Sequence, residues 1–225
     1  MPGPVWNNDH HADAATISDN AARLIKRLAA EAPSRELPIE ATVLAWHSEI
    51  YLGCQVPVAT YIGHFRGDTS VPELVGYEVG VGDLQHDGFP SKVGVWSVNV
   101  RNEVNSLFGA IRAAVAELDR LLPVGRRPGT VAELNAIVQL TASVHGEWVR
   151  IHPFANGNGR IARVWAAWLA FRYQLPAWVS VKPRPDDSAY AAAAKASMGR
   201  PPDFIGDHTL ASHVFAHMLT LSLLE

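Results

Sequence analysis

Apolar side chains recur at helical spacing over much of the chain. Between residues 18 and 32 they stand three and four positions apart, and Pro33 ends the run. The same periodicity returns over 40–51 and, as one long stripe, over 103–122. We therefore predict helices over these three ranges.

Helical patterning continues to the end of the chain. Thr130 and Glu133 form the Thr-x-x-Glu pattern of a capping box, in which each side chain binds a free backbone donor of the first helical turn. We expect this helix to reach about Val149. Three further helices are predicted, over 158–172, 187–198 and 207–224.

The segment 63–100 has a different pattern, rich in glycine and valine. Two short β-branched runs, 74–81 and 93–98, flank a loop that contains Asp87-Gly88, which is typical of a β-hairpin. The predicted fold class is thus mainly α, a helical bundle with one small inserted hairpin. We predict a flexible N-terminal arm over 1–15 and a single domain over 16–225.

Composition narrows the class of protein. Of 225 residues, 48% are hydrophobic and 18% charged, enough to bury a core. The 19 basic and 22 acidic side chains leave a net charge of −3, which argues against binding a nucleic-acid polymer. Cys54 is the only cysteine, so an internal disulfide is excluded. The sequence shows neither a signal peptide nor a membrane span, and a cytoplasmic protein is expected.

Candidate chemistry is concentrated between the helix that ends near Val149 and the one that begins at 158. Gly157 and Gly159 leave the first amides of a helix open to an anion, and the helix dipole favours negative charge there. Arg160 and Arg163 follow one turn apart, and guanidinium groups suit phosphate oxygens. These residues predict a cradle for a polyphosphate.

Three other side chains complete this segment. His152 is a candidate general base because imidazole titrates near neutral pH. Phe154 is expected to turn inward and anchor the loop, and the amide oxygen of Asn156 is a candidate Mg²⁺ ligand. Any one of these features is common in proteins, and it is their combination that is specific.

The segment resembles the signature of the Fic (filamentation induced by cAMP) family, His-x-Phe-x-Asp/Glu-Gly-Asn-Gly/Lys-Arg-x-x-Arg. Residues 152–163 match it at every fixed position except Asn156. Gly63-His64-Phe65-Arg66 is similar to the start of the family's flap, and 75–98 stands where the family has its target-docking hairpin. The resemblance covers about residues 40–220 and implies a Fic fold.

The resemblance implies a protein AMP-transferase, which moves AMP from ATP to a Ser, Thr or Tyr hydroxyl of a target protein and releases pyrophosphate. His152 would be the base, Asn156 would take the position of the Mg²⁺ (or Mn²⁺) ligand, and the target would dock on the hairpin. The nucleotide-binding residues that it implies are Gly157, Asn158, Gly159, Arg160, Arg163 and Tyr190.

One departure keeps alternatives open. Asn156 lacks the negative charge of the family's Asp or Glu, so the chain is a weakened AMP-transferase, a transferase of another nucleotide or phosphate-containing group, or a nucleotide- or partner-binding protein without chemistry. The family's inhibitory helix pattern, Ser/Thr-x-x-x-Glu-Gly/Asn, is not found. A separate inhibitor protein is therefore expected, as in the family's bacterial toxin–antitoxin members.

Overall fold

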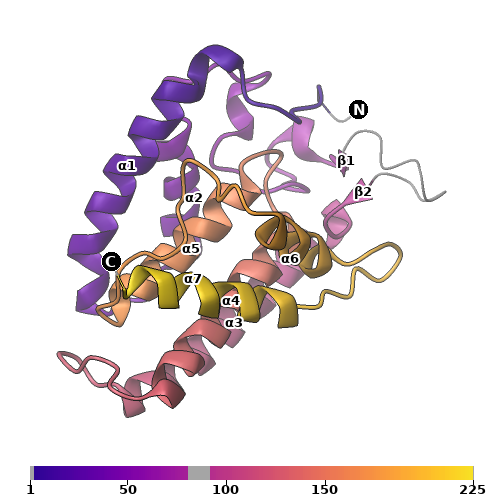
Figure 1. Cartoon of the computed structure of the whole chain (residues 1–225). Coiled ribbons are helices and arrows are strands. Elements are labelled where there is room, and N and C mark those ends of the chain that lie inside the picture. Colours follow the sequence, from indigo (N-terminus) through magenta and orange to yellow (C-terminus); the bar gives the residue numbers. More distant parts are fainter. Residues whose placement is uncertain (1–2, 81–91, 225) are drawn as a thin grey trace.

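The computed structural model describes residues 3–80 and 92–224 (Figure 1). Helices dominate this part of the chain, with one two-stranded antiparallel sheet that pairs Val79 with Val93. The mainly α architecture is confirmed. The helices are α1 (Ala14–Glu31), α2 (Glu40–Ile50), α3 (Ser97–Leu121), α4 (Val131–Ile151), α5 (Asn158–Arg172), α6 (Ser188–Met198) and α7 (Thr209–Ser222), and the strands are β1 (Val79–Gly80) and β2 (Lys92–Val93).

Local signals set several of these boundaries. The capping box is present, because the Thr130 hydroxyl accepts from the Glu133 amide while the Glu133 carboxylate accepts from the Thr130 amide. The Asp187 side chain caps the first turn of α6. α5 has the predicted bounds, 158–172. Side-chain caps thus fix the starts of α4 and α6, whereas α5 begins after Gly157 without a side-chain cap.

The hairpin strands are shorter than predicted. Leu74 lies in a short 3₁₀ turn, and Val98 already belongs to α3. The Ser97 amide and hydroxyl both donate to the Glu78 carboxylate, which draws the chain out of the sheet and starts the helix early. The predicted loop with Asp87-Gly88 lies outside the described residues.

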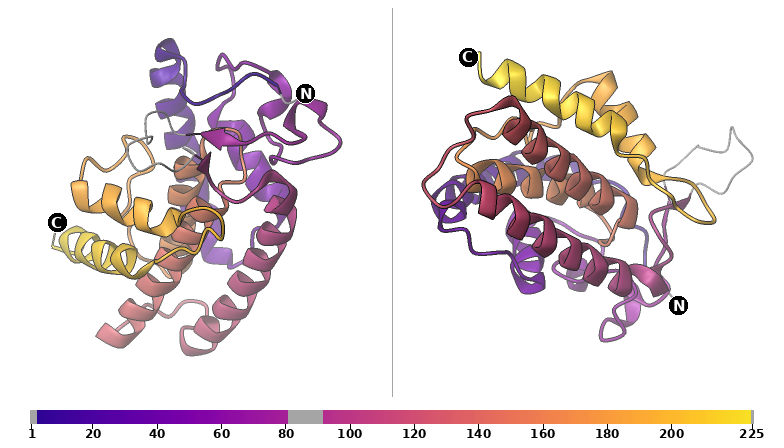
Figure 2. Two further views of the ribbon diagram at one scale, coloured as in Figure 1. Left: turned by 90° about the vertical axis from the view of Figure 1, so that its right-hand side faces the viewer. Right: turned by 90° about the horizontal axis from the view of Figure 1, so that it is seen from below.

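Helix α5 forms the centre of the molecule (Figure 2). It is buried on nearly all sides, including the tryptophans Trp165 and Trp168, and it packs most extensively against α4. A helix that is buried on nearly all sides occupies a core position, and here its buried residues include Asn158, Arg163 and Arg172. The loop between α4 and α5, which carries the motif, is therefore held by the two best-packed helices.

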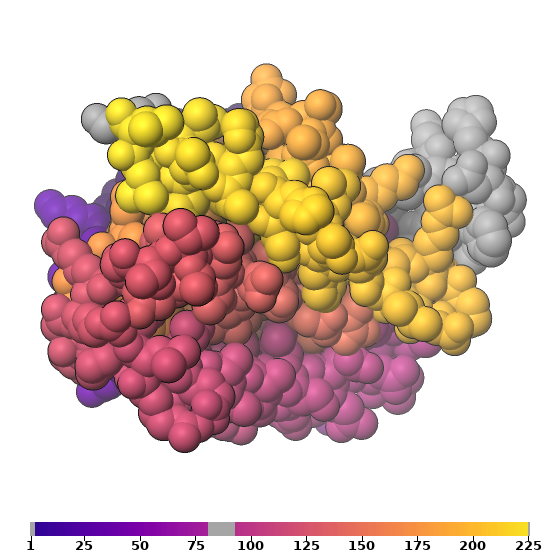
Figure 3. Space-filling model, turned by 60° about the horizontal axis from the view of Figure 1, so that its bottom comes forward, coloured from indigo at the N-terminus to yellow at the C-terminus, as the bar shows by residue number. Residues whose placement is uncertain are grey.

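The C-terminal helices cover one side of this core. α7 packs on α4 and α6, and in the space-filling view it lies on the surface beside the α3–α4 pair (Figure 3). No helix in 3–80 or 92–224 is both long and apolar enough to cross a membrane.

The N-terminal residues differ from the loose arm that composition suggests. Trp6 is buried against Tyr51 and Tyr61, and its backbone amide donates to the Tyr77 hydroxyl at 2.7 Å. Farther along, the Asp13 carboxylate accepts from the Gln55 amide at 2.8 Å. An aromatic anchor and a buried carboxylate thus dock residues 3–13 onto the domain.

Candidate active site

The motif loop joins α4 to α5 through two left-handed residues. α4 ends because His152 precedes Pro153, which disfavours a helical conformation, and His152 adopts φ 54°. Gly157 begins α5 with φ 84°. A Cβ at Gly157 would lie 2.8 Å from the Tyr51 ring, so only glycine fits there without strain.

The interior of the loop is closed by side chains. The Asn158 amide group donates to the Phe154 carbonyl and accepts from the Phe154 amide, each at 2.8 Å. Phe154 is fully buried, as expected for an anchor, and its ring stacks on His47 with centroids 3.9 Å apart. The Asn158 side chain is therefore buried and binds the loop itself.

His47 fixes the loop from α2. Its Nδ1 accepts from the Gly63 amide at 3.0 Å, so Nε2 carries the proton and donates to the Asn156 carbonyl at 3.0 Å. Burial lowers the pKa of His47 to about 3, which keeps this tautomer neutral.

His152 has the geometry of a base. Its Nδ1 lies 3.1 Å from the Val149 carbonyl, and because a carbonyl only accepts, Nδ1 carries the proton of the neutral ring. The nitrogen that can take up a proton is therefore Nε2. His152 and Asn156 line a cavity of about 270 Å³ whose other walls are Trp6, Asn7, Asn8, Val79, Gly80 and Ala155.

The base of the hairpin is joined to the same loop. A Cβ on Gly94 would lie 2.3 Å from the Cβ of His152, so the backbone next to β2 touches the histidine. Arg66 is buried between them: its guanidinium donates to the His152 carbonyl (2.7 Å), the Val95 carbonyl (3.0 Å) and the Glu78 carboxylate (3.0 Å). Burial lowers the pKa of Arg66 to about 10 despite the Glu78 charge. Arg66 thus connects the base of the hairpin physically to the motif loop.

Arg160 is paired with the N-terminal arm. Its two terminal nitrogens donate to the Asp9 carboxylate at 2.5 and 2.8 Å, and one of them also donates to the Tyr51 hydroxyl. Tyr51 and the Asn156 side-chain amide donate to Asp9 as well, at 3.2 and 3.1 Å. Burial alone would raise the pKa of Asp9, but the hydrogen bonds and charge of Arg160 outweigh it and lower the pKa.

Arg163, one helical turn farther along α5, has a different set of partners. It is buried and donates to the Val181 carbonyl at 3.1 Å and to the Tyr190 hydroxyl at 3.3 Å. Tyr190, also buried, lies 2.9 Å from Nε2 of His145. Burial and the charge of Arg163 lower the pKa of His145 to about 3, so its ring is neutral, and the Tyr190 hydroxyl accepts from Arg163. Tyr190 thus contacts the second motif arginine.

The Mg²⁺ that the resemblance implies does not fit this arrangement. The Asn156 oxygen accepts from the Gly157 amide at 2.6 Å, and the Asn156 nitrogen faces Asp9. Asp9 already accepts four hydrogen bonds, three on Oδ1 and one on Oδ2, and an arginine covers both oxygens. Among the residues that the structure describes, no three His, Cys, Asp or Glu side chains form a cluster that could hold a metal ion.

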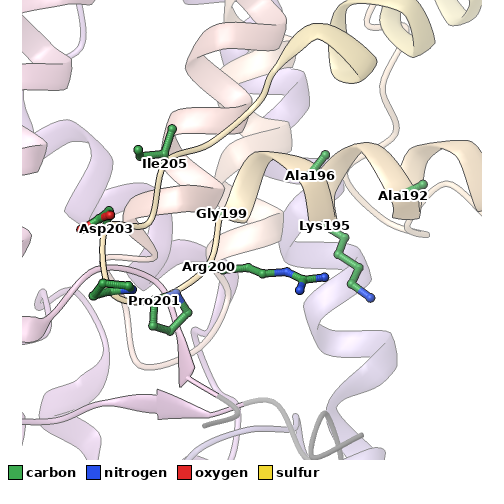
Figure 4. A pocket seen from close by; sticks show the side chains of 9 residues that line it. Ala192, Lys195, Ala196, Gly199, Arg200, Pro201, Asp203 and Ile205 are labelled. Carbon is green, nitrogen blue, oxygen red and sulfur yellow. The ribbon is translucent and has the colours of Figure 1, made fainter. Parts of the chain in front are cut away.

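A larger cavity, of about 590 Å³, lies between α6 and the loop that follows it (Figure 4). Lys195 and Arg200 extend along it, and none of its lining residues belongs to the motif. The chemistry of the motif, more than cavity volume, therefore identifies the candidate site.

Several site residues have no sequence signal of their own. The motif predicted the loop around His152, but Asp9, Tyr51 and His47 reach it from distant segments. The one sequence hint is Trp6, a lone large aromatic in an otherwise polar arm, which marks a docked segment.

A model of the Fic/DOC family matches residues 39–170, which include α2, the hairpin and the whole motif loop. The chain belongs to the Fic/DOC family. A similar solved structure is that of a Fic domain containing signaling protein from Bacteroides thetaiotaomicron, with a TM-score of 0.63 and 18% sequence identity, covering 92% of this chain and 70% of the other. This likeness supports the Fic fold. None of the curated proteins compared matches the sequence.

Proposed function

We propose that this Fic domain protein is an adenylyltransferase that moves AMP from ATP to a hydroxyl of a target protein. The observation that carries the proposal is the placement of His152, whose Nε2 is the proton-accepting nitrogen and whose side chain lines a cavity beside the hairpin and the start of α5. A base, a helix N-terminus and two arginines are the groups that phosphoryl-type transfer requires.

The proposed transfer consists of one proton transfer and one exchange of bonds at phosphorus. The target hydroxyl loses its proton to His152 Nε2, and its oxygen bonds to the α-phosphorus of ATP. The bond between that phosphorus and the oxygen bridging to the β-phosphate breaks, and pyrophosphate leaves with the electron pair. Arg160 and Arg163 would neutralise charge on the phosphates, and the first amides of α5 would bind the α- and β-phosphate oxygens.

The base of the hairpin supports docking of a target segment. β1 and β2 form a two-stranded ladder next to His152, and an extended segment could add to its edge through backbone hydrogen bonds. Arg66 would keep this edge at a fixed place relative to the base, because it binds the His152 and Val95 carbonyls together.

The test compares ATP labelled at the α-phosphate with ATP labelled at the γ-phosphate, in the presence of Mg²⁺ and of cell extract as a source of targets. Protein-bound label is expected from the α-labelled nucleotide alone. His152→Ala should reduce it by about 100- to 10,000-fold, the range for loss of a general base. His217→Ala, an exposed histidine of α7, is the matched control and should label like the unchanged protein.

Other outcomes separate the alternatives. Label from the γ-phosphate would show phosphate transfer, and label only from UTP or GTP would show a different nucleotide. Nucleotide binding without any label would favour a binding protein in which Asn156 marks lost chemistry.

A further inference from the structure

The Asp9 carboxylate lies in a site made entirely of donors. Two nitrogens of Arg160, the Tyr51 hydroxyl and the Asn156 amide nitrogen converge on its two oxygens, at 2.5 to 3.2 Å. This arrangement is a receptor for an anion with two or more oxygens, and a phosphate group has the same requirement. The guanidinium fork in particular fits both groups.

Asp9 occupies the place where an outside anion would bind both terminal nitrogens of Arg160. The Arg160 side chain is 11% exposed, and Asp9 covers both of its terminal nitrogens. The cavity beside the site is bounded by Asn156 on the motif side and by Asn7 and Asn8, the neighbours of Asp9, on the arm side. The arm therefore stands between the cavity and the first motif arginine.

We infer that Arg160, Tyr51 and Asn156 form an anion site whose internal ligand is Asp9, and that the phosphates of a nucleotide enter it by displacing the Asp9 carboxylate. This inference rests on the proposed function for the identity of the nucleotide. The anion site itself follows from the donors alone.

The inference also accounts for the amide at position 156. An Asp or Glu there would present a second carboxylate about 3 Å from Asp9, and two such charges repel each other strongly at that distance. Asn156 presents N–H groups in its place and binds Asp9. The amide at position 156, which departs from the family motif, is thus one of the groups that bind the docked arm.

Displacement requires only a short segment to move. Trp6 and Asp13 are both buried and hold the arm at either end, whereas most of the residues between them are exposed. Asp9 can therefore leave Arg160 while Trp6 and Asp13 stay in place. When a segment of the chain occupies the site, an outside ligand binds more weakly. Its apparent affinity is the affinity of the open site multiplied by the fraction of molecules in which the site is open.

The experiment measures binding of inorganic pyrophosphate and of ATP to the full chain by calorimetry, without added metal. Asp9→Asn keeps the shape of the side chain and removes its charge, and it should bind both ligands about tenfold tighter than the unchanged protein. Asp19→Asn, which neutralises an exposed aspartate of α1, is the matched control and should leave affinity unchanged. Saturating pyrophosphate should also speed hydrogen exchange at residues 7–12 of the unchanged protein.

Equal or weaker binding by Asp9→Asn would overturn the inference, because Asp9 would then support the anion site and not compete for it. Absence of pyrophosphate binding in every variant would overturn it too. Tighter binding by Asp9→Asn together with no AMP transfer by any variant would uphold the anion site and reject the adenylyltransferase proposal.

Discussion

The two motif arginines lie one helical turn apart on α5 and have opposite electrostatic surroundings. Arg160 forms a two-pronged ion pair with Asp9, whereas Arg163 binds a neutral carbonyl and a neutral hydroxyl. Burial alone lowers the pKa of both, but Tyr51 and Asp9 reverse the shift at Arg160, which ends above its ordinary pKa, while Arg163 ends below it.

This difference divides the motif into two regions. On the Arg160 side the positive charge is already neutralised by the chain, and an incoming anion must replace a carboxylate. On the Arg163 side the guanidinium has no carboxylate partner among the described residues, so its charge remains to be neutralised by a ligand. A buried charge without a counter-ion is the stronger attractor for phosphate.

The largest expected effect follows from this contrast. On the proposed function, Arg163→Gln should lower AMP transfer by about 100- to 1,000-fold, the loss typical of removing one group that stabilises developing charge. Arg160→Gln should lower AMP transfer by less than about tenfold, because on Arg160 a phosphate group only replaces the Asp9 carboxylate. Initial rates with α-labelled ATP check both, and a greater loss for Arg160→Gln would reverse the comparison.

Substitution of the two motif glycines should have different effects on the free energy of unfolding. Gly157→Ala forces a side chain into a left-handed position and against the Tyr51 ring, and we expect a loss of about 1–3 kcal/mol in the free energy of unfolding. Gly159→Ala is the matched control on the first helical turn, where the nearest atom is the Arg163 guanidinium at 3.3 Å. It should change stability by less than about 1 kcal/mol in urea denaturation.

Each region also contains one buried neutral histidine, His47 near Arg160 and His145 near Arg163. Burial lowers the pKa of both from 6.5 to about 3, so between these values the unfolded chain binds more protons than the folded one. The free energy of unfolding should therefore fall as pH drops from 6.5 toward 3, by up to about 1.4 kcal/mol per pH unit for each histidine.

His47→Gln and His145→Gln should each remove about one histidine's share of that slope, measured by urea denaturation at several pH values. His217→Gln, on the surface of α7, should leave the slope unchanged. A slope that survives both substitutions would mean that carboxylates, and not these histidines, carry the acid sensitivity.

The smallest effect should come from the two tyrosine hydroxyls. Tyr190→Phe removes one of the two hydrogen-bond acceptors of Arg163 and the partner of His145 Nε2, and it should lower the free energy of unfolding by about 1–2 kcal/mol. Tyr51→Phe should lower the free energy of unfolding by about 0.5–1 kcal/mol, because the ion pair between Arg160 and Asp9 remains. Thermal denaturation compares them, and equal losses would show that the two surroundings are alike in energy.

The helices and the motif loop could be predicted from the sequence because the interactions that form them are local. Apolar spacing and capping residues act within a few positions, so α4 and α5 lie close to their predicted ranges. The hairpin strands were predicted too long because the start of α3 depends on Glu78, a tertiary partner of Ser97. β-branched runs alone do not reveal such a partner.

The candidate site divides in the same way. That a histidine, two glycines and two arginines flank the start of one helix follows from their spacing along the chain, because short-range geometry depends on that spacing. Three contacts depend on the folded chain: Asp9, 151 positions away, neutralises Arg160, Asn156 donates to that carboxylate, and Tyr190 binds Arg163. Such pairings arise from the burial of Trp6 and the packing of α6 against α4. They cannot be predicted from the spacing of residues along the chain.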